Sequence, residues 1–277
     1  AHVEAPTPIS VVLAGILLKI GGYGLFRIAY SIFPEGAYYF GWWIGLFGVI
    51  AIVYGALVAM AQSDIKRLIA YSSVSHMGFV MLGLAAINSQ SVAGAIFQMF
   101  SHGLISAALF LIAGVIYDRT KDRQISSYSG LASGMPYFTV IVLITFFASL
   151  GLPGFSGFIA EFLILAGSFE GAMNLQILSI FMPILGVAGL VLGAAYFLWT
   201  FQRMFFGKYW VKEQSWELTD LTKREWVMFV PLLAMILIFG IFPGLILDLS
   251  NETIMSFVDL VQQQGKENLQ FILQNVK

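Results

Sequence analysis

The sequence predicts an all-α polytopic membrane protein with about seven transmembrane helices, one of them discontinuous. Of its 277 residues, 59% are hydrophobic and only 10% are charged, whereas soluble domains carry about 25% charged residues. Apolar runs of about 20 residues, long enough to cross a hydrocarbon core about 30 Å thick, recur along the whole chain. These runs lack the period-two alternation of a membrane β-barrel, so we expect the spans to be helices.

The composition also excludes several kinds of site. The formal net charge of −1 argues against nucleic-acid binding. Because the chain has no cysteine, it cannot itself hold an iron–sulfur cluster, a disulfide or a thiolate metal site. The sequence has no Gly-rich dinucleotide fingerprint, P-loop or HExxH motif. We therefore expect no catalytic residue, cofactor site or metal site in this chain.

The apolar runs define the predicted elements in chain order. The spans cover about residues 9–33, 42–62, 68–87, 92–117, 136–168, 176–206 and 226–247. Residues 1–8 contain no Met and no signal-peptide pattern, so we expect them to be the truncated start of a longer chain. In the tail, 248–277, four apolar residues share one helical face. This face predicts an amphipathic surface helix or an element packed against a partner. The four residues are Ile254, Phe257, Val258 and Val261.

Basic residues fall on every second loop, which predicts an orientation. The loops at 34–41, 88–91 and 169–175 contain no Lys or Arg. The alternate loops contain Lys66, Arg67, Arg119, Lys121, Arg123, Arg203, Lys208, Lys212, Lys223 and Arg224. The positive-inside rule places the basic loops in the cytoplasm or its equivalent. The first span then starts inside, and the tail lies outside.

Four ionisable residues lie near the middle of the apolar spans. Lys19 is in the first span, His76 in the third, His102 in the fourth and Glu161 in the second half of the fifth. Because a charged side chain at the bilayer centre costs about 2.5–3.5 kcal/mol on insertion scales, such residues normally face protein or water. Other polar residues extend these positions at i, i+4 spacing on one helix face. They are Ser72, Gln98, Ser106, Thr145 and Ser149.

The fifth span is interrupted by Gly151, Leu152, Pro153 and Gly154. A break within the bilayer frees backbone amides and carbonyls, which is tolerated only where they line protein or a water-filled cavity. Broken helices beside a charged residue are a recurring device of ion transporters. The break therefore predicts that Glu161, which follows it, takes and releases a proton.

Each polar residue also has a purely structural interpretation. A lone buried His is usually a hydrogen-bonded core residue, Lys19 could pair with an acid on another helix, and Ser and Thr often join membrane helices. Four ionisable groups at one depth favour a hydrated polar axis through the membrane. His76 and His102 suit a proton relay because imidazole titrates near neutral pH. Lys19 could be a relay or the charge that shifts its neighbours.

Five stretches resemble the antiporter-like subunits of respiratory complex I, in particular those of M type, called subunit 4 of NADH dehydrogenase in mitochondria. The stretches are AHVEAPTPISVVLAGILLKIGGYGLFR, DIKRLIAYSSVSHMGFV, FQMFSHGLISAALFLIAG, GLPGFSGFIAEFLIL and FQRMFFG. The resemblance extends from residue 1 to about 247. It implies a fourteen-helix fold with two inverted five-helix repeats that form linked half-channels.

The resemblance divides the chain and assigns roles to the four ionisable residues. It implies that 9–33 is the last helix of the first repeat, 42–206 the second repeat and 226–247 the final helix. It further implies that Lys19, His76, His102 and Glu161 belong to the family's polar axis. Glutamate at position 161 resembles the M-type chain, whereas the sister L- and N-type chains carry lysine there. The family's glutamate on the fifth helix and lysine on the seventh would lie upstream of Ala1.

The resemblance also implies the surroundings. NADH, FMN, iron–sulfur clusters and quinone are expected in partner subunits, with L- and N-type chains and lipid as direct neighbours and the hydrophilic redox subunits as indirect partners. A bacterial inner membrane is the expected location, and an organellar energy-converting membrane is the alternative. Three other functions remain open: a subunit of an Mrp-type Na⁺/H⁺ antiporter, a membrane subunit of a hydrogenase or formate-linked complex, and a purely structural element.

Overall fold

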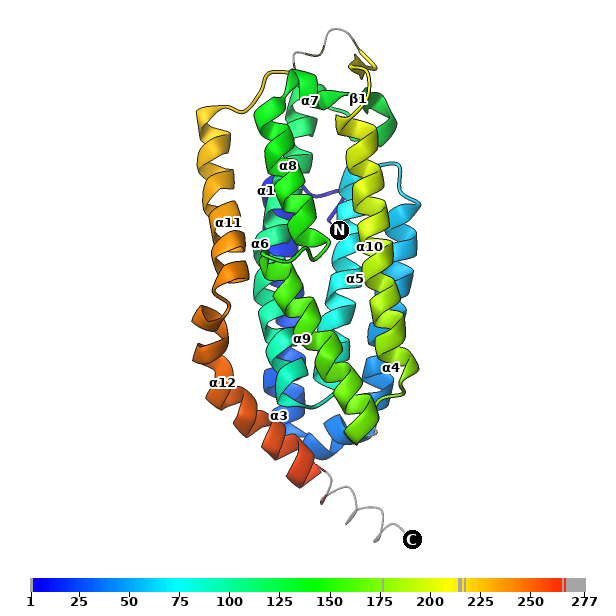
Figure 1. Cartoon of the computed structure of the whole chain (residues 1–277), viewed down its shortest axis with the longest axis vertical. Coiled ribbons are helices and arrows are strands. Elements are labelled where there is room, and N and C mark those ends of the chain that lie inside the picture. The colour runs from blue at the N-terminus through cyan, green and yellow to red at the C-terminus, as the bar shows by residue number, and fades with distance from the viewer. Residues whose placement is uncertain (1, 176, 214–215, 217, 266, 268–277) are drawn as a thin grey trace.

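The computed structural model describes residues 2–175, 177–213, 216, 218–265 and 267. The described chain forms an elongated bundle whose helices run along its long axis (Figure 1). Within the described residues, seven helices are long and apolar enough to cross a membrane: Thr7–Ile32, Pro34–Met60, Ile65–Ala85, Ser89–Thr120, Ser156–Leu175, Phe181–Phe205 and Lys223–Ile241. A shorter apolar helix, Pro136–Ser149, precedes the fifth. These helices confirm the predicted all-α membrane architecture.

The first helix contains two π-helical turns. It runs through α1 (Thr7–Val12), a π turn (Leu13–Leu17), α2 (Leu18–Gly24), a second π turn (Leu25–Ala29) and α3 (Tyr30–Ile32). A π turn inserts an extra residue and changes the direction in which the following side chains point, and such turns are frequent at functional sites. Lys19 is the second residue after the first π turn.

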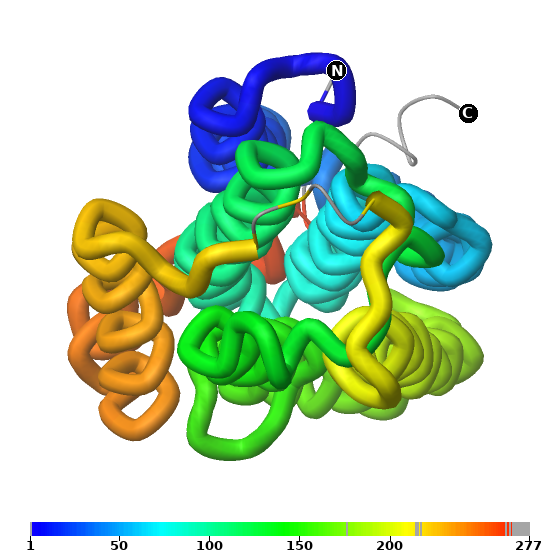
Figure 2. Tube along the Cα trace, turned by 90° about the horizontal axis from the view of Figure 1, so that it is seen from above, coloured from blue at the N-terminus to red at the C-terminus, as the bar shows by residue number. Residues whose placement is uncertain are grey.

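Two helices occupy the middle of the bundle. Seen from one end, α5 (Ile65–Ala85) and α6 (Ser89–Thr120) are surrounded by the other helices (Figure 2). Asp64 caps α5 by accepting from the N–H of Lys66 at 2.7 Å, and Asn88 caps α6 by accepting from the N–H of Ser91 at 2.9 Å. The polar residues of the predicted axis on α5 and α6 are therefore shielded by neighbouring helices.

Small residues allow α4 (Pro34–Met60) and α5 to lie close together. A methyl group on Gly55 would come within 2.8 Å of the Ser75 backbone nitrogen. Ser75 Oγ donates to the carbonyl of Ile52 across this contact at 2.9 Å. Close backbone approach at small residues is the usual basis of helix packing in membranes. It fixes the α5 segment that carries His76.

The fifth span is discontinuous, as the sequence predicts. It consists of α8 (Pro136–Ser149) and α9 (Ser156–Glu170), and residues 150–155 between them are not helical. Next come α10 (Phe181–Phe205), α11 (Lys223–Ile241) and α12 (Gly244–Asp259). A π turn, Leu260–Gln264, continues α12.

Three predicted boundaries are wrong. The segment 34–41 is helical, because Pro34 starts α4 at a position where its missing N–H costs nothing. Residues 169–170 belong to α9, and Gly171–Leu175 continue it as a π turn. The last span ends at Ile241, six residues before the predicted end, because Phe242 and Pro243 separate α11 from α12.

The apolar face of the tail packs against the chain's own bundle. Ile254, Phe257, Val258 and Val261 are all buried, in a cluster that also contains Phe26 and Tyr30 of the first helix. The Phe257 ring stacks on Tyr30 with centroids 5.8 Å apart. The predicted amphipathic helix therefore covers one end of this chain, while residues 266 and 268–277 of the tail lie outside the described part.

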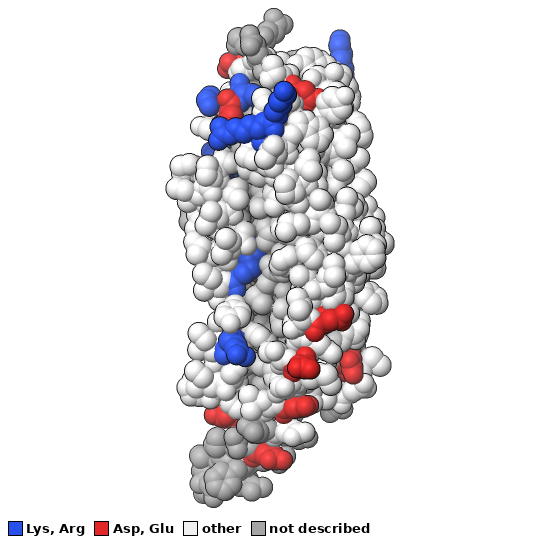
Figure 3. All heavy atoms as spheres, turned by 90° about the vertical axis from the view of Figure 1, so that its left-hand side faces the viewer, with Lys and Arg blue, Asp and Glu red and all other residues white. Residues whose placement is uncertain are grey.

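The basic loops gather at one end of the bundle. The strands β1 (Tyr128–Ser129) and β2 (Trp210–Val211) pair antiparallel and join two of these loops. The 3₁₀ turn Ile125–Ser127 and the short helix α7 (Leu131–Gly134) complete the connection. On the face shown in Figure 3, most Lys and Arg side chains lie near this end, whereas Asp and Glu side chains lie near both ends. The clustering agrees with the alternation read from the sequence.

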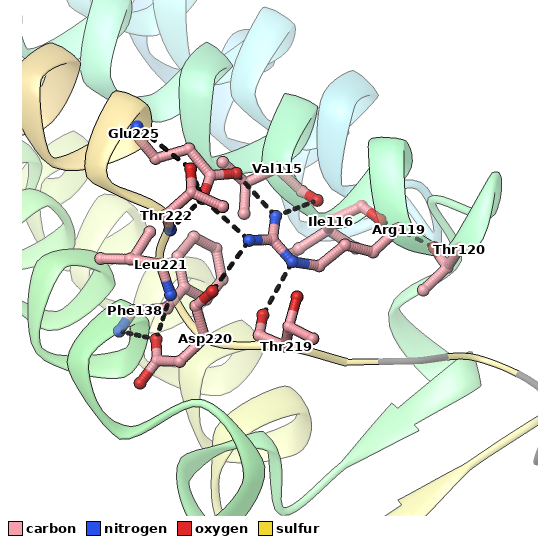
Figure 4. Close-up of polar contacts among 10 residues, drawn as sticks. All are labelled: Val115, Ile116, Arg119, Thr120, Phe138, Thr219, Asp220, Leu221, Thr222 and Glu225. Atoms are coloured by element: carbon pink, nitrogen blue, oxygen red, sulfur yellow. Dashed lines mark hydrogen bonds and ion pairs between the residues drawn. The ribbon is translucent and has the colours of Figure 1, made fainter.

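A partly buried arginine joins α6 to α11 and to the segment before α11 at the basic end (Figure 4). Arg119 of α6 donates to both carboxylate oxygens of Glu225 on α11, at 2.8 Å each, and to the carbonyl of Thr219 at 2.8 Å. The adjacent Asp220 carboxylate accepts from the backbone N–H groups of Tyr137 and Phe138, at 2.9 and 3.0 Å. These bonds anchor the start of α8, which leads to the break.

Candidate functional site

The four ionisable residues selected from the sequence form one row across four helices. Lys19 Nζ lies 2.7 Å from His102 Nδ1, and His76 Nδ1 lies 3.1 Å from Glu161 Oε1. The two imidazole rings lie side by side with centroids 5.3 Å apart and their planes tilted by 49°. The four residues are only 3–8% exposed. The order along the row is Lys19, His102, His76 and Glu161.

At one end of the row, Lys19 is turned toward α6 by the π turn before it. Its ammonium group donates to the carbonyl of Ala14 within that turn and contacts His102 Nδ1. A protonated lysine can only donate, so Nδ1 of His102 then accepts and the imidazole carries its proton on Nε2. His102 is thus ready to take a proton from Lys19.

At the other end, the Glu161 carboxylate lies inside the break between α8 and α9. A methyl group on Gly151 would overlap Glu161 Oε2, and Gly151 has a left-handed φ of +72°. Glycine therefore meets two needs here: it adopts the backbone conformation and it leaves room for the carboxylate. This explains why the glycine break and the buried acid occur together in the sequence.

The backbone of the break is satisfied within the protein. The N–H of Leu152 donates to the carbonyl of Phe147 at 3.1 Å, and the N–H of Gly151 to that of Ala148 at 3.4 Å. With Gly151 in the left-handed region, this is the Schellman ending of an α-helix, and Pro153 then prevents its continuation. The backbone N–H groups of Gly151 and Leu152 therefore stay hydrogen-bonded although the helix is interrupted.

Two neighbouring helices pack against one side of the break. A methyl group on Gly240 of α11 would come within 2.6 Å of Phe155 Cα. Ser101 Oγ of α6 donates to Ser156 Oγ, at the start of α9, at 2.7 Å. One side of the non-helical segment therefore packs on α6 and α11, while Pro153 and Gly154 are exposed on the other side.

The supporting polar residues differ in how close they come to the row. Ser149 Oγ lies 3.4 Å from His76 Nε2. Ser72 donates to the carbonyl of Ile69 and Ser106 to that of Gly103, so their hydroxyls bond mainly with their own helices. Gln98 is buried, and its Oε1 has no hydrogen-bond partner among the described residues.

The row can hold a mobile proton in two arrangements of equal total charge. In one, Lys19 is protonated and Glu161 is ionised; in the other, both are neutral. Transfer between them passes through two imidazoles, each able to accept at one nitrogen and donate from the other. In the described part of the chain no hydrogen bond joins the two rings, so a proton crosses there only after a ring rotates or a water intervenes.

Sequence reasoning missed one residue beside the row. The fully buried Tyr196 of α10 lines a small cavity with His76, Ser149 and Glu161. The row was identified from charged side chains and from the hydroxyls on the same helices, whereas Tyr196 lies in an apolar stretch. The available signal was its i, i+4 spacing to Thr200 on the same helix face.

Comparison with known proteins gives a consistent assignment. The family model described as NADH:quinone oxidoreductase/Mrp antiporter, TM, matches residues 1–198. NADH-quinone oxidoreductase subunit M of Rhodobacter capsulatus is 47% identical over 258 residues, which are 93% of this chain and 49% of that protein. The chain spans about half the length of the curated relatives it matches.

Two solved structures share the fold. A chain of respiratory complex I from Thermus thermophilus with bound NADH superposes with a TM-score of 0.83 at 32% identity, over 92% of this chain and 52% of that one. A chain of the Mrp complex from Dietzia sp. DQ12-45-1b gives a TM-score of 0.82 at 21% identity, over 96% and 56%. The second likeness, at this identity, shows the fold alone.

Proposed function

The chain belongs to the NADH:quinone oxidoreductase/Mrp antiporter transmembrane family, and from this premise we propose that it moves protons within the membrane arm of an NADH–quinone oxidoreductase. The chain is an integral membrane protein with seven apolar spanning helices in its described part. The observation that carries the proposal is the buried row from Lys19 through His102 and His76 to Glu161.

The proposed transfer uses the groups in their order along the row. Lys19 Nζ gives a proton to His102 Nδ1, and His102 releases its own proton from Nε2 toward His76. His76 Nδ1 then gives a proton to Glu161 Oε1, which becomes a neutral carboxyl group. Lys19 has lost one proton, Glu161 has gained one, and each imidazole is again neutral but carries its proton on the other ring nitrogen. A change of tautomer or a ring rotation then restores the starting arrangement.

The energy that each site must supply is moderate. Moving one charge against 100 mV costs about 2.3 kcal/mol. A change of about two pKa units between the two states of the complex is worth roughly that amount, at about 1.4 kcal/mol per unit. In this proposal the driving energy comes from oxidation of NADH by quinone in partner subunits, which would hold the FMN and iron–sulfur clusters.

The side of the bundle next to Lys19 fits a longer chain. An apolar groove of about 600 Å³ lies along the first helix, α6 and α11, and Lys19 lines it together with Ile16, Phe100 and Leu104. We infer that helices of the first inverted repeat cover this groove and supply the family's further glutamate and lysine. The described helices would then be the last helix of that repeat, the second repeat (42–206) and the final helix.

Two related functions share this fold. An Mrp-type chain would exchange Na⁺ for H⁺ without redox partners, and a hydrogenase-type chain would use another electron donor. The 47% identity to a subunit M over nearly the whole chain favours the NADH–quinone oxidoreductase. Its L- and N-type chains would be the membrane partners, and a bacterial inner membrane is the proposed location.

The test is Glu161→Gln in the full-length chain, assembled in its complex and reconstituted into vesicles. Glutamine keeps the shape of the side chain and cannot take up the proton. We expect proton pumping per NADH oxidised to be abolished while assembly is retained. The matched control is Glu170→Gln, an exposed position on the same helix. Failed assembly with unchanged pumping per assembled complex would establish a purely structural role.

A further inference from the structure

Tyr196 is a buried polar residue that the proposed proton row leaves unused. It is 1% exposed and lies on α10, in the middle of the bundle's length. Its hydroxyl lies within hydrogen-bonding reach of Ser72 of α5, whose own O–H donates to the carbonyl of Ile69. Buried tyrosine hydroxyls normally have hydrogen-bond partners, so a tyrosine in place of a phenylalanine here needs an explanation.

The small cavity beside Tyr196 has the size and lining of a water site. It leaves about 10 Å³ for the centre of a water molecule, about the room that one water requires. Its polar lining comes from Ser75, His76, Ser149, Glu161 and Tyr196. A buried water needs two to four polar partners, and this lining supplies them.

Polar groups of this lining have hydrogen-bonding capacity left in the structure. Ser149 Oγ and His76 Nε2 are 3.4 Å apart, which is long for a hydrogen bond. Glu161 uses Oε1 toward His76 and directs Oε2 toward Gly151. A carboxylate accepts more than one hydrogen bond, so Glu161 has capacity left for a water.

Two glycines of α10 leave room for this cavity. Gly189 and Gly193 both line the cavity. A methyl group on Gly189 would overlap the side chain of Ile52, so this glycine is needed for packing against α4. A methyl group on Gly193 would lie 3.8 Å from the Tyr196 hydroxyl, an ordinary contact with nothing nearer. Alanine at 193 would therefore occupy space near the hydroxyl without a clash.

We propose that this cavity holds one water that joins the Glu161 carboxyl group to the Tyr196 hydroxyl, which makes Tyr196 a positioning residue for the terminal proton of the row. The inference rests on the proposed function. The other titratable groups of the row are His76 on α5, His102 on α6 and Lys19 on the first helix.

Water and a phenol can reverse their hydrogen bonds, which suits both states of Glu161. When Glu161 is ionised, the Tyr196 hydroxyl donates to the water and the water donates to the carboxylate. When Glu161 has taken its proton from His76 Nδ1, the carboxyl O–H donates to the water and the water donates to the Tyr196 oxygen. No proton leaves Tyr196 in either state.

The test compares Tyr196→Phe with Tyr30→Phe in the full-length chain within its purified complex. Tyr30 is equally buried, and its hydroxyl has no partner in the described part of the chain. We expect Tyr196→Phe to lower the protons pumped per NADH about tenfold and Tyr30→Phe to leave them unchanged. In infrared difference spectra, the carboxyl stretch of protonated Glu161 should move to higher frequency in Tyr196→Phe, because a hydrogen bond is lost.

Gly193→Ala is the second variant, because it keeps the tyrosine and fills the space for the water. It should reproduce both the pumping loss and the infrared shift, and it decides the question if Tyr196→Phe does not assemble. The inference is overturned, and the proposed function stands, if Glu161→Gln abolishes pumping while both α10 variants leave pumping and the infrared band unchanged. Unchanged pumping in Glu161→Gln would overturn both.

Discussion

At the scale of single residues, His102 is the point where the row changes from a hydrogen bond to a ring contact. Its Nδ1 lies 2.7 Å from Lys19 Nζ, and its ring lies beside the tilted ring of His76, with centroids 5.3 Å apart. A proton that passes from Lys19 to Glu161 must enter and leave this imidazole by different nitrogens. Removing the ring interrupts the row and leaves both of its ends in place.

We therefore predict that His102→Ala lowers proton pumping by about tenfold or more, in line with the contribution of a positioned acid–base group. The measurement is protons moved per NADH oxidised in vesicles, normalised to assembled complex. His102→Gln is the companion variant: it fills part of the space and cannot relay a proton, so it should be as impaired as alanine. Pumping at the normal ratio in both variants would remove His102 from the path.

At this scale the charged residues of the row were the easiest to identify from the sequence. Lys19, His76, His102 and Glu161 were found because burying a charge in a bilayer is costly, and depth in a helix can be counted from sequence. Their mutual distances could not be predicted, since these depend on helix rotation and on the π turn before Lys19. Tyr196 was missed because a phenol in an apolar helix costs little and gives no such signal.

At the scale of elements, the break between α8 and α9 combines a backbone turn with a place for an acid. Gly151 and Gly154 both have left-handed φ values, +72° and +97°. They differ in their surroundings: a methyl group on Gly151 would overlap the Glu161 carboxylate, whereas one on Gly154 would meet nothing within 4 Å. Alanine at either position strains the backbone, but only alanine at 151 also displaces the Glu161 carboxylate, so comparing the two substitutions separates these effects.

We predict that Gly151→Ala and Gly154→Ala each lower stability by about 1–2 kcal/mol, the cost of a left-handed residue with a Cβ. Only Gly151→Ala should also impair pumping, because it moves the carboxylate away from His76. Thermal unfolding in detergent and proton pumping in vesicles are the two measurements. Equal pumping in the two variants would show that the position of the carboxylate within the break does not matter.

The bidentate contact between Arg119 and Glu225 joins α6 to α11 at the basic end, where the Asp220 carboxylate binds the start of α8. Lysine at 119 keeps the charge but cannot reproduce the forked geometry or the bond to Thr219. We predict a loss of about 1–3 kcal/mol in Arg119→Lys, as expected for charge-assisted hydrogen bonds. Arg224→Lys, at an exposed position of α11, is the control. Indistinguishable melting temperatures would show that this contact contributes no stability.

The presence of each membrane helix could be predicted from the sequence, whereas several helix ends could not. Continuous apolar runs and the Gly-Leu-Pro-Gly motif identified the spans and the break. The start of α4 at Pro34 was missed because the mixed stretch 34–41 looks like a loop, although proline at the first helical position favours a helix. The acid that pairs with Arg119 gave no sequence signal, since the two residues meet only in the folded bundle.

At the scale of the whole molecule, the bundle encloses its polar row and carries most of its basic residues at one end (Figure 3). The two helices with histidines, α5 and α6, are central, and the basic loops share one end (Figures 2 and 3). The alternation of basic loops predicted that gathering. The groove along Lys19 was not predictable, because it depends on how the first helix, α6 and α11 are spaced.

We predict that the native complex, purified in mild detergent through the C-terminal end of this chain, contains flavin and iron–sulfur subunits. The chain itself should be about twice the length described here, since it spans about half of its curated relatives. Mass analysis of the purified complex is the measurement. Copurification of small membrane subunits alone would support the Mrp-type function instead.

The central claim is that one proton connects Lys19 to Glu161, and infrared difference spectroscopy of the intact complex during NADH oxidation tests it most directly. The account predicts a band from the protonated Glu161 carboxyl group that is absent in Glu161→Gln and strongly reduced in Lys19→Leu, because the proton that reaches Glu161 has left Lys19. A Glu161 band of normal intensity in Lys19→Leu, together with normal pumping, would contradict the account.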